Sequence, residues 1–294
     1  MTGKLPWDQL LVLGCAQSCA VALPAVIANI SRLRRLFAAS QVLILENDSS
    51  DATLALLRQW CQYDPGTHVG SLPGLNDQLP IKTERLAHLR NGGMDWMRQR
   101  GLLRDSALLL VLDCDEVNAE PWDLQAFTEV LAWFAAQPQA AGVFANQRGE
   151  YYDLWALRHP RHGPDDLWER QFALHLQQPQ LSDQQLLEAV LQTRRFRLAE
   201  QAQPMAVDSA FGGLGFYRGS WLRRLPQAAY VGSRSCWVGA AAEARLIRWQ
   251  CAEHVAFHAH LRSAGAQLWI HPRLLNWSTP GLRLNPSSWR YLQF

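Results

Sequence analysis

The sequence lacks a surplus of charge of either sign and a cysteine pattern that could form a disulfide framework. Its 28 Lys and Arg residues face 26 Asp and Glu residues, which leaves a net charge of +2. That balance argues neither for nor against a nucleic-acid partner, and we expect none. The six cysteines are not spaced like disulfide pairs or zinc ligands, so we expect reduced thiols in a cytoplasmic protein.

Several common motifs are missing as well. His254 and His258 are four residues apart, but no HExxH sequence is present, which argues against a zinc protease. The glycine content of residues 14–18 is too low for the GxGxxG or P-loop sequences that cradle phosphates. No internal repeat or low-complexity tract occurs. The sequence is therefore typical of a globular chain, whose 294 residues suffice for one large α/β domain or two small ones.

Long uninterrupted hydrophobic runs are also absent. Residues 10–30 carry no charge and could suggest a signal anchor, but the strictly apolar part ends at Leu13. Gln17, Pro24 and Asn29 interrupt the remainder of this segment. A membrane-spanning helix needs about 20 apolar residues. We therefore expect a short strand, a loop and an amphipathic helix.

The sequence does contain a regular alternation of short apolar segments with segments of helical periodicity. Expected strands cover residues 10–13, 41–45, 68–72, 107–112 and 142–145. Expected helices cover residues 20–37, 52–62, 82–99 and 121–136. This alternation predicts a mostly parallel sheet with helices on both faces, in which ligands bind at the carboxyl ends of the strands.

The pattern becomes less regular in the second half of the chain. Residues 151–157 are aromatic and predict a strand, and residues 164–203 predict two helices, the second around residues 183–197. The sequence then predicts a helix over residues 253–264 and a strand over residues 267–271. We expect one catalytic domain whose second half is irregular and faces an acceptor.

Acidic residues come after two of the expected strands. Asp113 and Asp115 stand directly after the most apolar strand, and Glu46 and Asn47 stand after the second one. Two carboxylates one residue apart at a strand end can hold one Mg²⁺ or Mn²⁺, together with phosphate oxygens and water. The alternative is a solvated acidic loop that caps the next helix. Glu46 and Asn47 could bind a base or ribose, or form part of a loop and helix cap.

Glu253 begins an expected helix, where an acid is favoured by the helix dipole. Its functional interpretation is a base or a holder of an acceptor hydroxyl, and the alternative is a capping residue. The thirteen tryptophans are an unusual number. Tryptophan in surplus often lines sites that stack on flat or sugar-like ligands, although core packing accounts for any single one.

Six segments in order resemble the GT-A type glycosyltransferases, and most closely the family of fungal capsule α-mannosyltransferases and their bacterial relatives. The segments are LENDSSDAT (45–53), RLAHLRN (85–91), DCDEVN (113–118), YYDLWALR (151–158), DSAFGGLG (208–215) and EHVAFH (253–258). The resemblance covers about residues 10–275. The resemblance implies a GT-A-like, Rossmann-type fold with an irregular acceptor-facing C-terminal half.

The resemblance also implies a hexosyltransferase that uses a nucleotide-diphosphate sugar, GDP-mannose or a UDP-hexose, with Mn²⁺ or Mg²⁺. Residues 1–150 would form the nucleotide-sugar-binding half, and residues 151–294 the donor-pocket and acceptor-facing half of the same domain. The acceptor would be a glycan or a lipid-linked sugar in surface polysaccharide or glycolipid synthesis. A lipid-linked acceptor would place the protein at the inner face of the membrane.

Individual roles are implied by the same resemblance. Base, ribose, diphosphate and sugar would meet Glu46, Asn47, Arg85, Arg90, Asn91, Asp113, Tyr152, Trp155, Arg158, Gly212 and Gly213. The metal ligands would be Asp113 and Asp115, with His258 or His271 as a late histidine ligand. The catalytic acids would be Glu253, Asp208 and Asp153, with Glu253 as the first candidate for a base if the reaction inverts configuration and Asp208 as the second. A retaining reaction would need no general base.

Two other classes of function stay open on the residues alone. A glycoside hydrolase or a nucleotidyltransferase could use the same acids, although a hydrolase needs two carboxyls on opposite sides of the scissile bond, and Asp113 and Asp115 are too close together for that. A non-catalytic sugar- or nucleotide-binding module would account for the many tryptophans.

Overall fold

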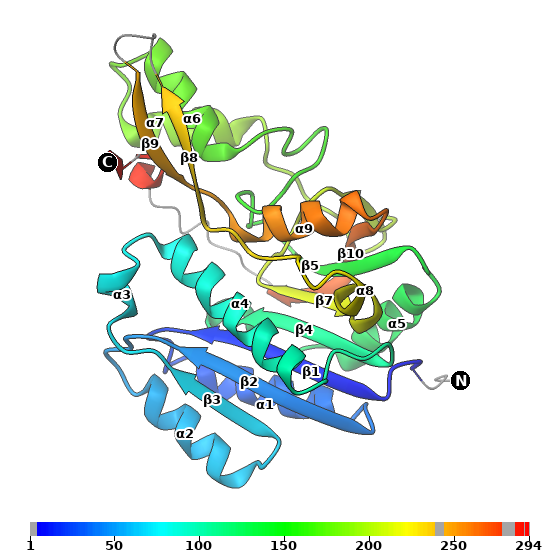
Figure 1. Cartoon of the computed structure of the whole chain (residues 1–294). Coiled ribbons are helices and arrows are strands. Elements are labelled where there is room, and N and C mark those ends of the chain that lie inside the picture. The colour runs from blue at the N-terminus through cyan, green and yellow to red at the C-terminus, as the bar shows by residue number, and fades with distance from the viewer. Residues whose placement is uncertain (1–4, 239–243, 278–285, 291, 294) are drawn as a thin grey trace.

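We analysed a computed structural model of the chain. It describes residues 5–238, 244–277, 286–290 and 292–293 (Figure 1). None of the helices in these ranges combines the length and the apolar character that a membrane crossing needs.

A central sheet of eight strands organises the described part of the chain, in the order β3-β2-β1-β4-β7-β5-β10-β6. Six of its strands run parallel, and only β7 and β6 are antiparallel to their neighbours. The strands are β1 (Gln9–Ala16), β2 (Ala39–Glu46), β3 (Thr67–Ser71), β4 (Ala107–Asp113), β5 (Ala140–Gln147), β6 (Met205–Val207), β7 (Leu214–Arg218) and β10 (Gln267–Trp277). Strands from both halves of the sequence therefore share one sheet.

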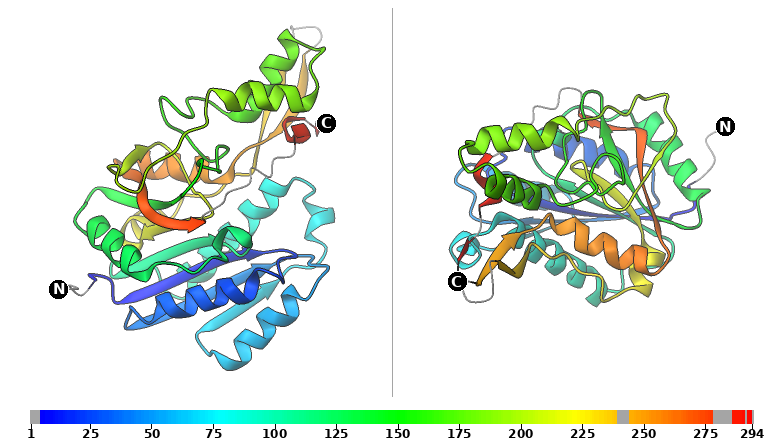
Figure 2. Two further views of the ribbon diagram at one scale, coloured as in Figure 1. Left: turned by 180° about the vertical axis from the view of Figure 1, so that it is seen from behind. Right: turned by 90° about the horizontal axis from the view of Figure 1, so that it is seen from above.

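Helices cover both faces of this sheet, and the two faces have separate apolar cores (Figures 1 and 2). Alternate residues of β1 point to opposite cores: Leu10 and Val12 to one, Leu11 and Leu13 to the other. A strand buried on both faces has a continuous apolar sequence, which is why the sequence predicts it well. One face carries α1 (Leu23–Arg34), α2 (Thr53–Tyr63) and α5 (Leu124–Ala135), and the other carries α4 (Lys82–Gln99) and α9 (Glu253–Ser263).

This architecture confirms the expected mixed α/β class, with a large, mostly parallel sheet flanked by helices, and it is consistent with a Rossmann-like GT-A arrangement. All nine expected elements between residues 10 and 145 are present. Helix α5 begins at Leu124 and not at residue 121, because the Asp123 side chain accepts hydrogen bonds from the backbone of Gln125 and Ala126 and so fixes the helix start. A short 3-10 turn at Glu116–Asn118 precedes it.

Part of the second half of the chain forms an arm that stands away from the central sheet (Figure 2). It contains α6 (Leu167–Gln177) and α7 (Asp183–Gln192), which confirms the two helices expected between residues 164 and 203. Beside them lies a separate sheet that the sequence did not predict, in the order β11-β9-β8. Its strands are β8 (Ser233–Val238), β9 (Arg245–Gln250) and β11 (Leu292–Gln293), and short helices α3 (Leu75–Gln78) and α8 (Gly219–Arg224) complete the fold.

The strand predicted over residues 151–157 is wrong, because this segment is a turn-containing loop. Its aromatic residues are buried by packing outside any sheet: Tyr151 stacks on Phe196 with ring centroids 5.2 Å apart. The backbone N–H of Leu154 donates to the carbonyl of Tyr152, which closes a tight turn. Aromatic burial in an ordered loop gives the same sequence pattern as a strand.

Candidate functional site

The carboxyl ends of three neighbouring strands lie level with one another. Cys15 of β1 is opposite both Leu45 of β2 and Asp113 of β4. The loops that begin at Glu46 and at Asp113 therefore leave the same edge of the sheet. This confirms that the two polar strand ends lie at one edge of the sheet, where parallel α/β sheets bind ligands.

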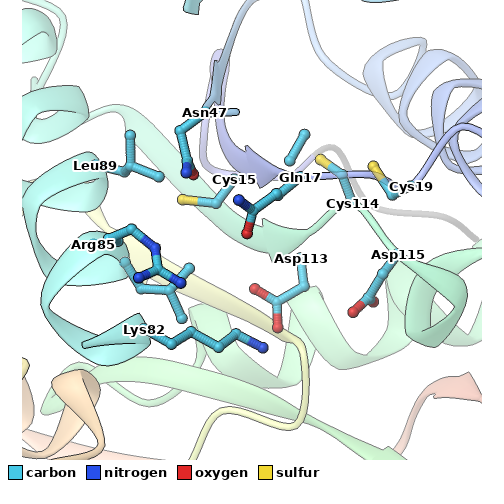
Figure 3. Close-up of a pocket in the computed structure, with 12 residues that line it drawn as sticks. Cys15, Gln17, Cys19, Asn47, Lys82, Arg85, Leu89, Asp113, Cys114 and Asp115 are labelled. Carbon is cyan, nitrogen blue, oxygen red and sulfur yellow. The ribbon is translucent and has the colours of Figure 1, made fainter. Parts of the chain in front are cut away.

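A cavity of about 130 Å³ lies between these strand ends and the first turns of α4 (Figure 3). We call it the strand-end cavity. It is lined mainly by polar groups and thiols: Cys15, Gln17, Cys19, Asn47, Lys82, Arg85, Asp113, Cys114 and Asp115, together with Ala16, Leu86 and Leu89.

A second and larger cavity, of about 430 Å³, adjoins the first. We call it the aromatic cavity, because Tyr152, Trp155, Trp168 and Phe211 line it. Its polar and charged lining residues are Lys82, Thr83, Arg90, Asp113, Asp153, Gln250, Glu253 and His254. Lys82, Leu86 and Asp113 line both cavities, so the two spaces meet at the first carboxylate of the acid pair.

The acid pair, Asp113 and Asp115, is held by the backbone around it. The N–H of Asp113 donates to the carbonyl of Gly213 at 3.0 Å, and the amide of Asn118 donates to the Asp113 carbonyl at 2.8 Å. A carboxylate oxygen of Asp115 accepts from the N–H of Val117 at 3.2 Å and caps the 3-10 turn. The positions of both acids are thus fixed before any ligand arrives.

Burial and mutual repulsion disfavour the charged forms of these acids. Burial raises the pKa of Asp115 to about 7, and the charges of Asp113 and Glu116 add to this shift. Burial also raises the pKa of Asp113, against the opposing effect of the Arg90 guanidinium. A site that raises the pKa of two neighbouring carboxyls gains stability from a cation placed between them.

Asp113 and Asp115 offer the oxygen ligands that Mg²⁺ and Mn²⁺ prefer. Within the described ranges, however, no group of three or more His, Cys, Asp and Glu side chains is arranged to hold a metal ion. Mg²⁺ is commonly bound by only one or two carboxylates plus substrate phosphates and water. The two acids therefore fit a hard cation that shares its coordination with a phosphorylated ligand.

The structure does not bring either histidine candidate into a metal-binding group with the acid pair, as far as the described residues extend. Both ring nitrogens of His258 are used, one with Ser209 Oγ and one with Tyr217 Oη, each at 2.8 Å. Burial lowers its pKa to about 3, so it is a neutral core residue. His271 lies on β10, packs edge to face against Trp133 with centroids 5.0 Å apart and is largely buried there.

Arg90 is 1% exposed and bridges two carboxylates. It donates to Asp113 at 2.8 Å and also pairs with Glu253 at the start of α9, and its guanidinium lies over the ring of Phe211. The charge of Arg90 is balanced by these two carboxylates, so Arg90 positions Asp113 and Glu253. Asn91, the next residue, exchanges two hydrogen bonds of 2.9 Å with the backbone of Tyr230.

Two of the residues expected at the nucleotide, Asn47 and Arg85, line the strand-end cavity. Asn47 lines it and donates to Asn76 at 3.2 Å. Arg85 lines it and donates to the carbonyls of Leu79 and Pro80. Glu46 is 2% exposed and accepts from Ser49 N–H and Ser71 Oγ, so it supports the loop from beneath.

The residues expected at the sugar gather at the aromatic cavity. Tyr152, Asp153 and Trp155 line it. Asp153 accepts from the N–H of Gly212 at 3.0 Å, and burial raises its pKa to about 6. Gly213 has φ of +79°, and a Cβ there would lie 2.2 Å from a Val117 methyl, so only glycine fits beside the acid pair.

Several expected residues line neither cavity: Glu46, Asn91, Arg158, Asp208, Gly212, Gly213, His258 and His271. Arg158 pairs with Asp166 and donates to two carbonyls of its own loop. Asp208 pairs with Arg262 at 2.6 Å, and both acid and base line a separate cavity of about 260 Å³. The structure therefore places neither Arg158 nor Asp208 at the acid pair.

Sequence reasoning missed several lining residues, among them Phe211, His254 and Lys82. Phe211 stacks on the His254 ring at 3.8 Å, and both nitrogens of His254 lack a hydrogen-bond partner among the described residues. Lys82 lines both cavities and is one of only two lysines in the chain. Its rarity, three residues before the RLAHLRN segment, was the available signal.

Comparisons with known proteins add little to this geometry. No protein-family profile and no curated protein matches the chain. Among solved structures, the chain is similar to the mannosyltransferase PcManGT from Pyrobaculum calidifontis in complex with GDP-Man and Mn²⁺, at 14% identity and a TM-score of 0.47, over 93% of this chain and 57% of that one. It is also similar to S. aureus TarS 1-349, at 9% identity and a TM-score of 0.46, over 92% of this chain and 60% of that one. The chain thus spans less than two thirds of either structure, and likenesses this distant carry no argument about function.

Proposed function

We propose that the chain is a metal-dependent glycosyltransferase that moves a hexose from a nucleotide-diphosphate sugar to a glycan or glycolipid acceptor. One observation carries the proposal: Asp113 stands in the shared wall of a polar cavity and an aromatic cavity. A nucleotide sugar has the matching order of parts, with a polar nucleoside at one end, a hexose at the other and a diphosphate between them.

In this proposal the diphosphate lies at the acid pair. Asp113 and Asp115 would hold Mn²⁺ or Mg²⁺, which when bound neutralises the charge of the departing diphosphate. Arg90 keeps Asp113 oriented through its 2.8 Å contact and leaves the second carboxylate oxygen available. The polar surface of the strand-end cavity, with Asn47 and Arg85, receives the base and ribose.

The hexose would enter the aromatic cavity. Flat aromatic side chains such as Tyr152 and Trp155 pack against the apolar faces of sugar rings, and Asp153 offers acceptor oxygens for hydroxyl groups. Gly212 and Gly213 bring the backbone close beneath this space, because their positive φ angles bend the chain there. GDP-mannose and UDP-hexoses are the donors to test first.

Glu253 is the acid proposed to meet the acceptor. It lines the aromatic cavity, is 6% exposed and pairs with the buried Arg90, and a carboxylate held in such a cavity can act as a general base. Trp168 and Gln250 of the arm line the same cavity, so the arm would contribute to the acceptor side. Surface polysaccharide or glycolipid synthesis is the role that we propose for this transfer.

The aromatic lining also favours a second candidate, a sugar-binding module without catalysis. A donor screen separates the two functions. Purified protein is incubated with GDP-mannose and with UDP-hexoses in Mn²⁺ or Mg²⁺, and release of the nucleoside diphosphate is measured for wild type and for Asp113→Asn. The transferase predicts metal-dependent hydrolysis of one donor that the substitution abolishes. Sugar binding without any nucleotide release would favour the binding module.

A further inference from the structure

Lys82 stands at the junction of the two cavities. It is the first residue of α4 and lines both spaces together with Asp113 and Leu86. Figure 3 shows its side chain extended across the floor of the strand-end cavity, with the ammonium group directed toward the Asp113 carboxylate. Among the described residues, Arg85 is the only other cation that lines the strand-end cavity.

The other cations near the acid pair are already engaged by the protein. Arg90 is buried and divides its donors between Asp113 and Glu253. One nitrogen of Arg85 donates to two backbone carbonyls. The Lys82 ammonium, in contrast, is exposed and forms no ion pair or hydrogen bond with any side chain in the part of the chain that the structure describes.

The choice of lysine is itself informative. Of the 28 cationic residues of the chain, 26 are arginines, and Lys82 is the only lysine among the described residues. Arginine forms a rigid, planar fork that would bind a neighbouring carboxylate in two places, whereas lysine is a compact point charge on a flexible stem. A flexible point charge can leave a carboxylate and turn to a phosphate within the same space.

We propose that Lys82 is a diphosphate-binding residue that also competes with the divalent cation while the site holds no nucleotide. This inference rests on the proposed function. With no ligand, its charge partly neutralises Asp113 and Asp115 and so weakens metal binding by the bare acid pair. When a nucleotide diphosphate binds, the ammonium turns to the phosphate oxygens and the acids are released to the metal. Metal and nucleotide would therefore bind together better than either binds alone.

The proposal predicts opposite changes for two ligands in one variant. In Lys82→Gln, the dissociation constant for GDP or UDP in the presence of Mn²⁺ should rise about ten- to a hundredfold, the usual worth of one charged hydrogen-bonding group. The dissociation constant for Mn²⁺ alone should instead fall, by about threefold or more, because a competing positive charge is gone. A residue with a merely structural role would not move the two constants in opposite directions.

Calorimetry for the nucleotides and electron paramagnetic resonance of free Mn²⁺ give the two constants. Lys82→Arg keeps the charge but not the flexible point charge, so it should restore only part of the nucleotide affinity. Arg58→Gln, at an exposed residue of α2 outside both cavities, controls for the lost unit of charge. Unchanged constants in Lys82→Gln, beside a wild type that binds nucleotide with Mn²⁺, would overturn the role of Lys82 and leave the proposed function standing. A wild type that binds neither GDP nor UDP with Mn²⁺ would overturn both.

Discussion

Replacing Arg90 by methionine should lower the free energy of unfolding by about 3–5 kcal/mol at pH 7.5, the usual cost of removing one partner of a buried ion pair. Arg90 is 1% exposed, and its two partners, Asp113 and Glu253, belong to different elements whose carboxylates would be left facing each other. For a chain of this size such a loss corresponds to a fall in melting temperature of about 6–20 °C.

The pH dependence of this loss tests its electrostatic origin. Burial raises the pKa of Asp113 and the Arg90 guanidinium opposes this, so without the guanidinium the pKa of Asp113 rises further above its value in the unfolded chain. Acids whose pKa is raised on folding stabilise the native state at low pH and lose that contribution as pH rises through the folded pKa. The difference between Arg90→Met and wild type should therefore be small near pH 4 and should grow toward pH 8.

Thermal unfolding followed by circular dichroism across this pH range measures the effect. Arg223→Met serves as the matched control, because Arg223 pairs with Asp105 at 2.8 Å on the surface, where both side chains are more than half exposed. That pair should contribute less than about 1 kcal/mol. A second change, Glu253→Gln, should recover part of the stability of Arg90→Met. A deficit below about 1 kcal/mol, or one that does not vary with pH, would refute the account of Arg90 as the link between the two acids.

Further predictions concern two glycines and the buried acid Asp153 of the aromatic cavity. Gly213→Ala should lower the free energy of unfolding in urea by about 2–4 kcal/mol, because the new Cβ would sit at a positive φ and 2.2 Å from a Val117 methyl. Gly92→Ala, on an open helix face, should instead raise it by about 0.5–1 kcal/mol. Equal effects at the two glycines would contradict this. Burial raises the pKa of Asp153 to about 6. Wild type should therefore lose stability relative to Asp153→Asn as pH rises from 4 to 7, even if the amide changes stability by a constant amount at every pH. A wild type that gains stability relative to the variant over this range would refute this prediction.

The elements that the sequence predicts well are those whose pattern is local. The helix Lys82–Gln99 matches its expected bounds, and the strand at residues 107–112 is only one residue short. The position of Asp113 at a strand end was predicted from the abrupt change from apolar to acidic residues. Continuous apolar runs and helical periodicity contain this information because each residue reports on its own burial.

The rest depends on contacts between distant parts of the chain. The pairing of Arg90 with Glu253 joins residues 163 positions apart, and nothing in either segment indicates it. His258 resembles a metal ligand in the sequence, but its partners Ser209 and Tyr217 lie 49 and 41 residues away and make it a core residue. The β8–β9 hairpin shows only two buried positions, Ile247 and Trp249, in its second strand, which is too short an alternation to distinguish from a loop.

The most direct test of the proposed transferase is a calorimetric titration of GDP and UDP, with and without Mn²⁺, into wild type and Asp115→Asn. The amide keeps the capping acceptor for Val117 N–H and removes only the charge, so the fold should be retained. The account predicts that wild type binds one nucleotide at least about tenfold more tightly with Mn²⁺ and that the variant loses this dependence. Nucleotide binding that is equal with and without Mn²⁺, or sugar binding with no affinity for either nucleotide, would contradict it.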